Sequence, residues 1–239
     1  MTVLLISLAA FAATLIGGLV AIRYRDRLHL ILGFSAGAVV GVALFDLLPE
    51  AMSMAGRFHP PQRISLFVAG GFFAYLLVDR LLLLHPQSHD HHHHHAPRGA
   101  LGAGTLSLHS LLDGIAIGVG YQASPAVGLI VAAAVLTHDF SDGINTVGFI
   151  LKDGSGWRRA LPWLLLDAAA PVLGAASTLF FRIPENAIGL VLALFAGSFL
   201  YLGASDLIPE SQHAHPRAAT TLMTLLGAAV IYAAVRAVG

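Results

Sequence analysis

Apolar segments long enough to cross a membrane follow one another along almost the whole chain. A spanning helix needs roughly 20 apolar residues. Eight segments meet that length, at 2–22, 29–52, 64–84, 100–121, 125–151, 159–181, 187–209 and 217–238. Only 11% of the residues are charged, against about 25% in soluble domains. We therefore expect an all-α polytopic membrane protein with eight transmembrane helices, and one transmembrane domain over 1–239.

The first segment has no basic residue before its apolar run, so we interpret it as a retained helix rather than a cleaved leader.

The orientation of the chain in the membrane follows from the short loops, because Lys and Arg concentrate on the inner side of a membrane. Placing both termini outside gives the inner loops nine of the 13 basic residues and leaves Arg57, Arg63, Arg182 and Arg236 outside. This bias predicts outward termini, and we expect an integral protein of the plasma membrane, the inner membrane of a bacterium.

One sequence pattern occurs twice, 160 residues apart. Ala36-Gly37 precedes Asp46-Leu-Leu-Pro-Glu50, and Ala196-Gly197 precedes Asp206-Leu-Ile-Pro-Glu210 at the same spacing. The two copies lie five segments apart and would cross the bilayer in opposite directions. This indicates an inverted repeat, helices 1–3 against helices 6–8, around helices 4 and 5. Its acids would form an outer and an inner mouth of a pathway; alternatively, each copy is a polar helix end stopped by proline.

The apolar segments carry carboxylates but no Lys or Arg near their middles. A bare carboxylate at bilayer depth costs several kcal/mol, so such groups normally face a cavity and pair with a cation. The chain has no cysteine, which excludes disulfides and thiolate metal sites. A metal ion held by imidazole and oxygen would supply the missing positive charge.

Two segments contain the pattern His-x-x-x-Asp-Gly, at His109 to Gly114 and at His138 to Gly143. Residues four apart share one face of a helix, so each helix offers one imidazole and one carboxylate. Two such faces form a four-ligand site that suits Zn²⁺, Fe²⁺ or Mn²⁺ rather than alkali ions. The expected main ligands are His109, Asp113, His138 and Asp142. The glycines that follow the aspartates would let the helices approach closely.

A second, weaker metal position is expected beside the first. Asp139 adds an oxygen about 100° round its helix from His138, and Ser110 occupies the corresponding place on the other helix. Asp167 stands one turn before Pro171, which frees a carbonyl and bends the helix. The alternatives are that the histidines are buried donors satisfied by carbonyls and that Asp167 is satisfied by a serine or water.

A histidine-rich tract lies between the third and fourth segments, at 85–99. It would be a cytoplasmic loop that buffers or senses metal, or else a dispensable linker. Its internal position and interruption by Asp90 argue against an affinity tag. The candidate ligands are His89, His91, His92, His93, His94 and His95.

His-Ser-Leu-Leu-Asp-Gly and His-Asp-Phe-Ser-Asp-Gly, with the paired acidic-proline motifs, resemble the ZIP (Zrt-, Irt-like protein) family of divalent metal transporters. The resemblance covers essentially the whole chain. It implies import of Zn²⁺, or of Cd²⁺, Fe²⁺ or Mn²⁺, as substrate, with no catalytic cofactor. The expected partners are the metal ion, the lipid bilayer and a second copy of the chain in a homodimer. No nucleic-acid partner is expected.

The resemblance also implies a binuclear site and relative movement of two helix groups, 1, 4, 5 and 6 against 2, 3, 7 and 8. The chain departs from the family pattern at several metal-site positions. Many relatives have Asn in place of Ser110, Glu in place of Asp113 and Asp142, and Glu in place of Ala170. These departures remove oxygen donors from the second metal position, although Asp167, one turn before the position of the missing glutamate, would partly replace it.

Two other functions fit part of the pattern. A cation-diffusion-type exporter also uses His-x-x-x-Asp pairs, but usually has six helices and a cytosolic C-terminal domain. An intramembrane zinc hydrolase would use His109, Asp113 and His138 as ligands and Asp142 as general base. Because no His-Glu-x-x-His motif is present, we expect a transporter and not an enzyme.

Overall fold

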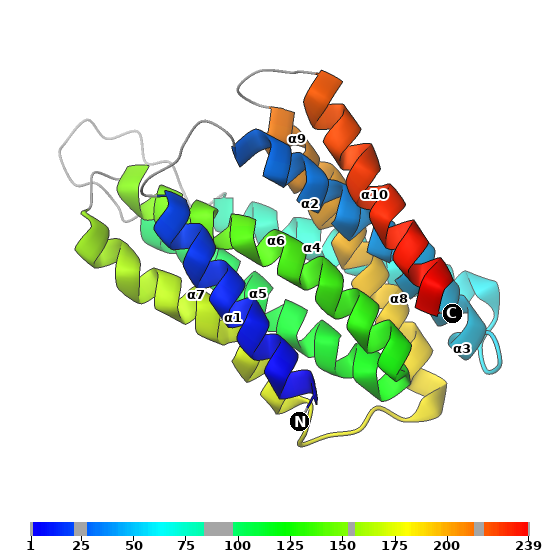
Figure 1. Cartoon of the computed structure of the whole chain (residues 1–239). Coiled ribbons are helices and arrows are strands. Elements are labelled where there is room, and N and C mark those ends of the chain that lie inside the picture. Colours follow the sequence, from blue (N-terminus) through cyan, green and yellow to red (C-terminus); the bar gives the residue numbers. More distant parts are fainter. Residues whose placement is uncertain (1, 22–27, 84–97, 153–155, 213–217, 239) are drawn as a thin grey trace.

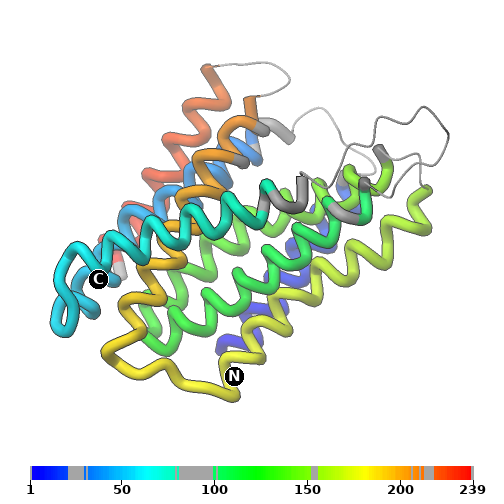
Figure 2. The backbone as a smooth tube through the Cα atoms, turned by 180° about the vertical axis from the view of Figure 1, so that it is seen from behind, coloured from blue at the N-terminus to red at the C-terminus, as the bar shows by residue number. Residues whose placement is uncertain are grey.

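The structure, a computed structural model, describes residues 2–21, 28–83, 98–152, 156–212 and 218–238, and those residues are almost entirely helical. Figures 1 and 2 show the helices packed side by side in one tilted bundle. Figure 1 places the beginning of α1, the end of α10 and α3 at the same end of the bundle. The elements are α1 (Thr2–Ala21), α2 (Leu28–Val42), η1 (Ala43–Leu47), α3 (Leu48–Ala55), α4 (Pro61–Leu83), α5 (Arg98–Ala123), α6 (Pro125–Lys152), α7 (Trp157–Ser177), α8 (Glu185–Tyr201), η2 (Leu202–Leu207), α9 (Ile208–Gln212) and α10 (Ala218–Val238).

The helices correspond closely to the eight expected spans, since α2-η1-α3 and α8-η2-α9 each form one continuous stretch. Within the described residues, seven helices are long and apolar enough to cross a membrane. The remaining long helix, α5, is 26 residues long but carries His109, Asp113 and several serines, which lower its hydropathy. The prediction of an all-α polytopic membrane protein is confirmed.

Two π-helical segments, η1 and η2, interrupt the helices that carry the repeated sequence pattern. The Leu48 N–H bonds to the carbonyl of Ala43, and the Ile208 N–H bonds to the carbonyl of Gly203. Each wide turn comes directly before a proline, Pro49 or Pro209, whose ring would collide with the carbonyl four residues earlier in a regular α-helix. The donor and the acceptor of the second bond each lie 160 residues after those of the first. The sequence repeat is therefore also a structural repeat. Figure 1 shows α3 and α9 at opposite ends of the bundle, as an inverted repeat requires.

Paired helices approach so closely that a glycine on each faces the backbone of the other. A β-carbon at Gly143 on α6 would collide with the carbonyl oxygen of Thr14, and one at Gly17 on α1 would collide with that of Phe140. The same reciprocal contact joins α5 to α7 through Gly114 and Gly174, α2 to α10 through Gly37 and Gly227, and α4 to α8 through Gly71 and Gly197. Gly114 and Gly143 were expected to bring α5 and α6 close to each other, but they instead bring α5 close to α7 and α6 close to α1.

These glycine pairs make α6 sensitive to a single added methyl group. We expect Gly143→Ala to lower the melting temperature of detergent-purified protein by at least about 5 °C, because the methyl group overpacks a backbone contact. The matched control on the same helix is Gly148→Ala, where an added β-carbon meets nothing within 4 Å. That variant should be as stable as wild type or slightly more so. Equal melting temperatures for the two variants would contradict this packing.

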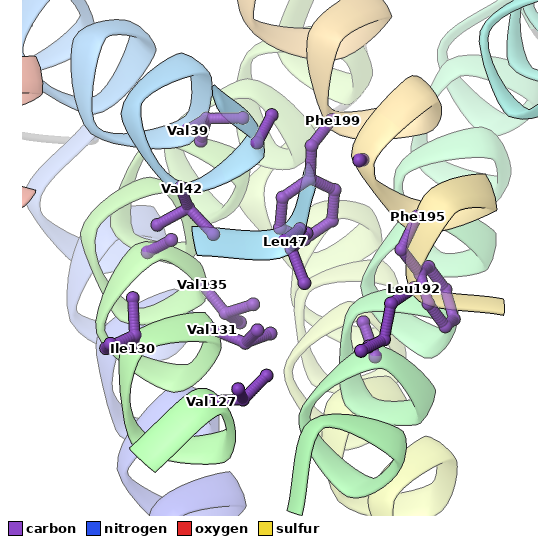
Figure 3. Close-up of a cluster of buried hydrophobic side chains, with 14 of the residues drawn as sticks. Val39, Val42, Leu47, Val127, Ile130, Val131, Val135, Leu192, Phe195 and Phe199 are labelled. Carbon is purple, nitrogen blue, oxygen red and sulfur yellow. The ribbon is translucent and has the colours of Figure 1, made fainter. Parts of the chain in front are cut away.

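A hydrophobic core joins α6 to the helices of the repeat. Val131 and Val135 of α6 belong to the same buried cluster as Val39 and Val42 of α2, and Figure 3 shows Leu47 between the two pairs. A hydrogen bond also links the helices, since the Ser35 hydroxyl on α2 donates to the Thr137 carbonyl on α6 at 2.6 Å. This packing holds the stretch of α6 that leads directly to His138.

Candidate metal centre

The two His-x-x-x-Asp faces meet in the interior of the bundle. His109 and Asp113 come from α5, and His138 and Asp142 come from α6. One ligand atom from each of the four residues lies within 4.8 Å of all the others. None of these residues is more than 4% exposed. The structure therefore brings together all four of the main ligands expected from the sequence.

Asp113 lies at the centre of this cluster. Its Oδ2 atom is 2.9 Å from His109 Nε2 and 3.1 Å from His138 Nε2. Asp142 Oδ2 lies 3.8 Å from both of those nitrogens. Two ligands of a tetrahedral Zn²⁺ ion, each about 2.0 Å from the metal, are separated by about 3.3 Å. The observed distances are thus close to those of a four-ligand site for one small divalent ion.

His138 is oriented by its own helix. Its Nδ1 atom lies 2.9 Å from the Ala134 carbonyl oxygen. Because a carbonyl only accepts hydrogen bonds, Nδ1 carries a proton. Nε2 faces the cluster, 3.1 Å from Asp113 Oδ2, and would bind a metal ion through its lone pair once it has given up its own proton. A backbone carbonyl that fixes the tautomer in this way is a common support for a metal-binding histidine.

His109 is held differently. Neither of its ring nitrogens has a hydrogen-bond partner within the described residues. Its Nε2 atom is close to Asp113, but the two groups are not aligned for a hydrogen bond. The ring packs edge-on against Tyr75 of α4, with centroids 5.6 Å apart, and at a tilt against His138 at 5.4 Å. Packing and not hydrogen bonding therefore sets the direction of this imidazole.

The cluster lacks a resident cation in the described part of the chain. The ion pairs found there involve either the two histidines of the cluster or Arg57 and Glu185, which are exposed. Asp142 Oδ2 is buried and also lacks a hydrogen-bond partner among the residues described. Unpaired buried polar atoms are costly, and a bound cation would satisfy His109, His138 and both carboxylates together.

The residues expected at the second metal position lie in two different environments. Asp139 is completely buried, and neither of its oxygens has a hydrogen-bond partner among the residues described. Ser110 and Asp167 instead bond to each other, the hydroxyl donating to Asp167 Oδ1 at 2.7 Å. The Thr146 hydroxyl donates to Asp167 Oδ2, also at 2.7 Å. The sequence analysis missed Thr146, although it continues the four-residue spacing of His138 and Asp142.

The structure describes only part of the expected pathway. Asp46 lies in η1 with Oδ2 buried and unpaired among the described residues, and Glu50 follows one turn later at a partly exposed position. Asp206 and Glu210 lie on η2 and α9, but their side chains fall outside the described part of the structure. The histidines of the tract, His89 and His91 to His95, also lie outside the described residues.

A family model described as ZIP zinc transporter matches residues 1–104 and 85–234 of the chain. The chain belongs to the ZIP family. The expected resemblance is thereby confirmed, and the two matched ranges together include the metal cluster and both copies of the repeat.

Among the relatives of this ZIP protein is human zinc transporter ZIP6, which is 30% identical over 137 residues, 54% of this chain and 18% of that protein. Zinc transporter ZIP13 of Pongo abelii is 22% identical over 77% of this chain and 58% of its own length. Zinc transporter ZIP9-A of Xenopus laevis is 26% identical over 86% of this chain and 84% of its own. This ZIP protein thus spans less than two thirds of ZIP6 and ZIP13 and most of ZIP9-A.

Proposed function

We propose that this ZIP protein transports Zn²⁺ across a membrane through His109, Asp113, His138 and Asp142. The observation that carries the proposal is the convergence of these four buried ligands within 4.8 Å, inside helices of a membrane protein. Among the described residues no Lys or Arg pairs with them. Two imidazoles and two carboxylates favour Zn²⁺ and neighbouring divalent ions such as Cd²⁺, Fe²⁺ and Mn²⁺ over alkali ions. The relatives named above are zinc transporters, which supports zinc as the first ion to test.

The proposed route runs inward, with both termini outside, as the family resemblance and the loop charges imply. Asp46 and Glu50 would attract the ion at the outer mouth, and Asp206 and Glu210 would receive it at the inner one. The histidines between 85 and 99 would then buffer the released metal. On this proposal Zn²⁺ is the substrate that the protein moves rather than a catalytic cofactor.

Flux into liposomes tests this function. Purified protein reconstituted around a trapped zinc-sensitive dye should admit Zn²⁺ faster than protein-free liposomes. Cd²⁺, Fe²⁺ and Mn²⁺ should slow the zinc signal by competing for the same ligands, whereas Na⁺ and K⁺ should not.

Equal zinc entry with and without protein would contradict transport. Cells that lose zinc when they make the protein would favour the exporter alternative. Cleavage of a membrane peptide by zinc-loaded protein, without flux, would favour the hydrolase alternative.

A further inference from the structure

A buried cluster of three polar side chains ties together the helices around the proposed metal site. Asp167 on α7 accepts one hydrogen bond from Ser110 on α5 and one from Thr146 on α6, both at 2.7 Å. All three residues are completely buried. Each hydroxyl has a single proton, and both protons are donated to the same carboxylate.

The two hydroxyls lie next to the proposed metal ligands along their helices. Ser110 directly follows His109 on α5, and Thr146 lies one turn after Asp142 on α6. One carboxylate on a third helix therefore bonds to both ligand-bearing helices. The glycine contact between Gly114 and Gly174 sets how closely α5 and α7 approach. The hydrogen bonds to Asp167 also fix how each helix is rotated about its own axis, which close packing alone does not fix.

We infer that Asp167 is a positioning residue and not a metal ligand, and that it holds α5 and α6 in the rotation at which their His-x-x-x-Asp faces converge. This inference rests on the proposed function of the four-residue site. Metal sites need their ligands held within about 0.5 Å and 10–20° of the working geometry. Because Asp167 already accepts from two helices, removing either hydrogen bond frees one of the helices to rotate.

The decisive variant is Thr146→Val, which keeps the shape of the side chain and removes only the hydroxyl. It takes away no candidate ligand, yet we expect it to weaken zinc binding about fivefold or more, the loss that one buried hydrogen bond of roughly 1 kcal/mol represents. The visible spectrum of bound Co²⁺ should also change, because it reports the geometry of the ligands. The matched control is Ser107→Ala, since within the described structure the buried Ser107 hydroxyl bonds to the Ala103 carbonyl of its own helix and not to the cluster.

Substitutions of Asp167 separate a positioning role from a ligand role. Asp167→Ala should weaken zinc binding roughly 10–100-fold, as changes to residues that support a metal ligand usually do. Asp167→Asn should restore most of that loss, because a carboxamide can still bond to both hydroxyls. The number of ions bound per chain should be the same in wild type and in both variants.

These measurements should use protein in which His89 and His91 to His95 are replaced by serine, so that ions bound by the tract are not counted. Thr146→Val with wild-type affinity and an unchanged Co²⁺ spectrum would overturn the inference. So would an Asp167→Asn protein as weak as Asp167→Ala, or the loss of one ion per chain from either. If wild-type protein bound neither Zn²⁺ nor Co²⁺, the proposed function itself would fail.

Discussion

Replacing Asp113 by alanine should lower the affinity for Zn²⁺ at least about 100-fold, more than the 10–100-fold that changes to supporting residues cost. It should also reduce uptake into liposomes to the protein-free level. Asp113 Oδ2 is the atom that both imidazoles share, at 2.9 Å from His109 and 3.1 Å from His138. Its loss leaves two neutral rings and Asp142, which lies further from both nitrogens.

Ser107→Ala is the control for this experiment because it removes a buried polar group from the same helix without touching the cluster. Zinc affinity by calorimetry and uptake by a trapped dye should both be unchanged in the control. Because the histidine tract would also bind Zn²⁺ if it buffers metal as proposed, the affinity measurement again needs the tract replaced by serine. An Asp113→Ala protein that still transports Zn²⁺ at the wild-type rate would contradict the assignment of the site.

Zinc should also stabilise the folded protein strongly. Without metal, both His109 nitrogens and Asp142 Oδ2 are buried and have no hydrogen-bond partner within the described structure. Only the folded protein brings the four ligands together, so binding shifts the unfolding equilibrium by about 2.7 kcal/mol when free zinc is 100 times its dissociation constant. For a chain of this size, that corresponds to a rise in melting temperature of roughly 5–10 °C.

Thermal unfolding in detergent measures this shift directly. We expect Zn²⁺ to raise the melting temperature of wild-type protein and Mg²⁺, which prefers an all-oxygen octahedral site, to leave it nearly unchanged. Asp113→Ala should be insensitive to zinc. The same zinc-induced shift in wild type and in Asp113→Ala would show that the stabilising ion binds elsewhere.

Much of the architecture follows from local rules that a single sequence contains. Segment length predicts the spans, and four-residue spacing predicts that His109 and Asp113 share one face, as do His138 and Asp142. The wide turns at η1 and η2 were not predicted, because proline signals only that the regular helix fails and not how the backbone adapts. Their recurrence at the same point of both copies emerged only from the structure.

The fine structure of the site depends on contacts between helices that the sequence does not encode locally. The duplicate motif suggests equivalent histidines, yet His138 donates to the Ala134 carbonyl while His109 rests on Tyr75 of another helix. The pairing of Asp167 with a serine was one of the expected alternatives. Its second partner, Thr146, was not expected, since it lies on α6 beyond the end of the His-x-x-x-Asp-Gly pattern.

Anomalous diffraction at the zinc absorption edge tests the central claim most directly. Crystals of zinc-loaded protein with the histidine tract replaced by serine should show a strong anomalous peak bounded by His109, Asp113, His138 and Asp142. Metal–ligand distances there should be about 2.0–2.2 Å. A zinc peak found only outside this cluster, with the cluster itself empty, would contradict the account.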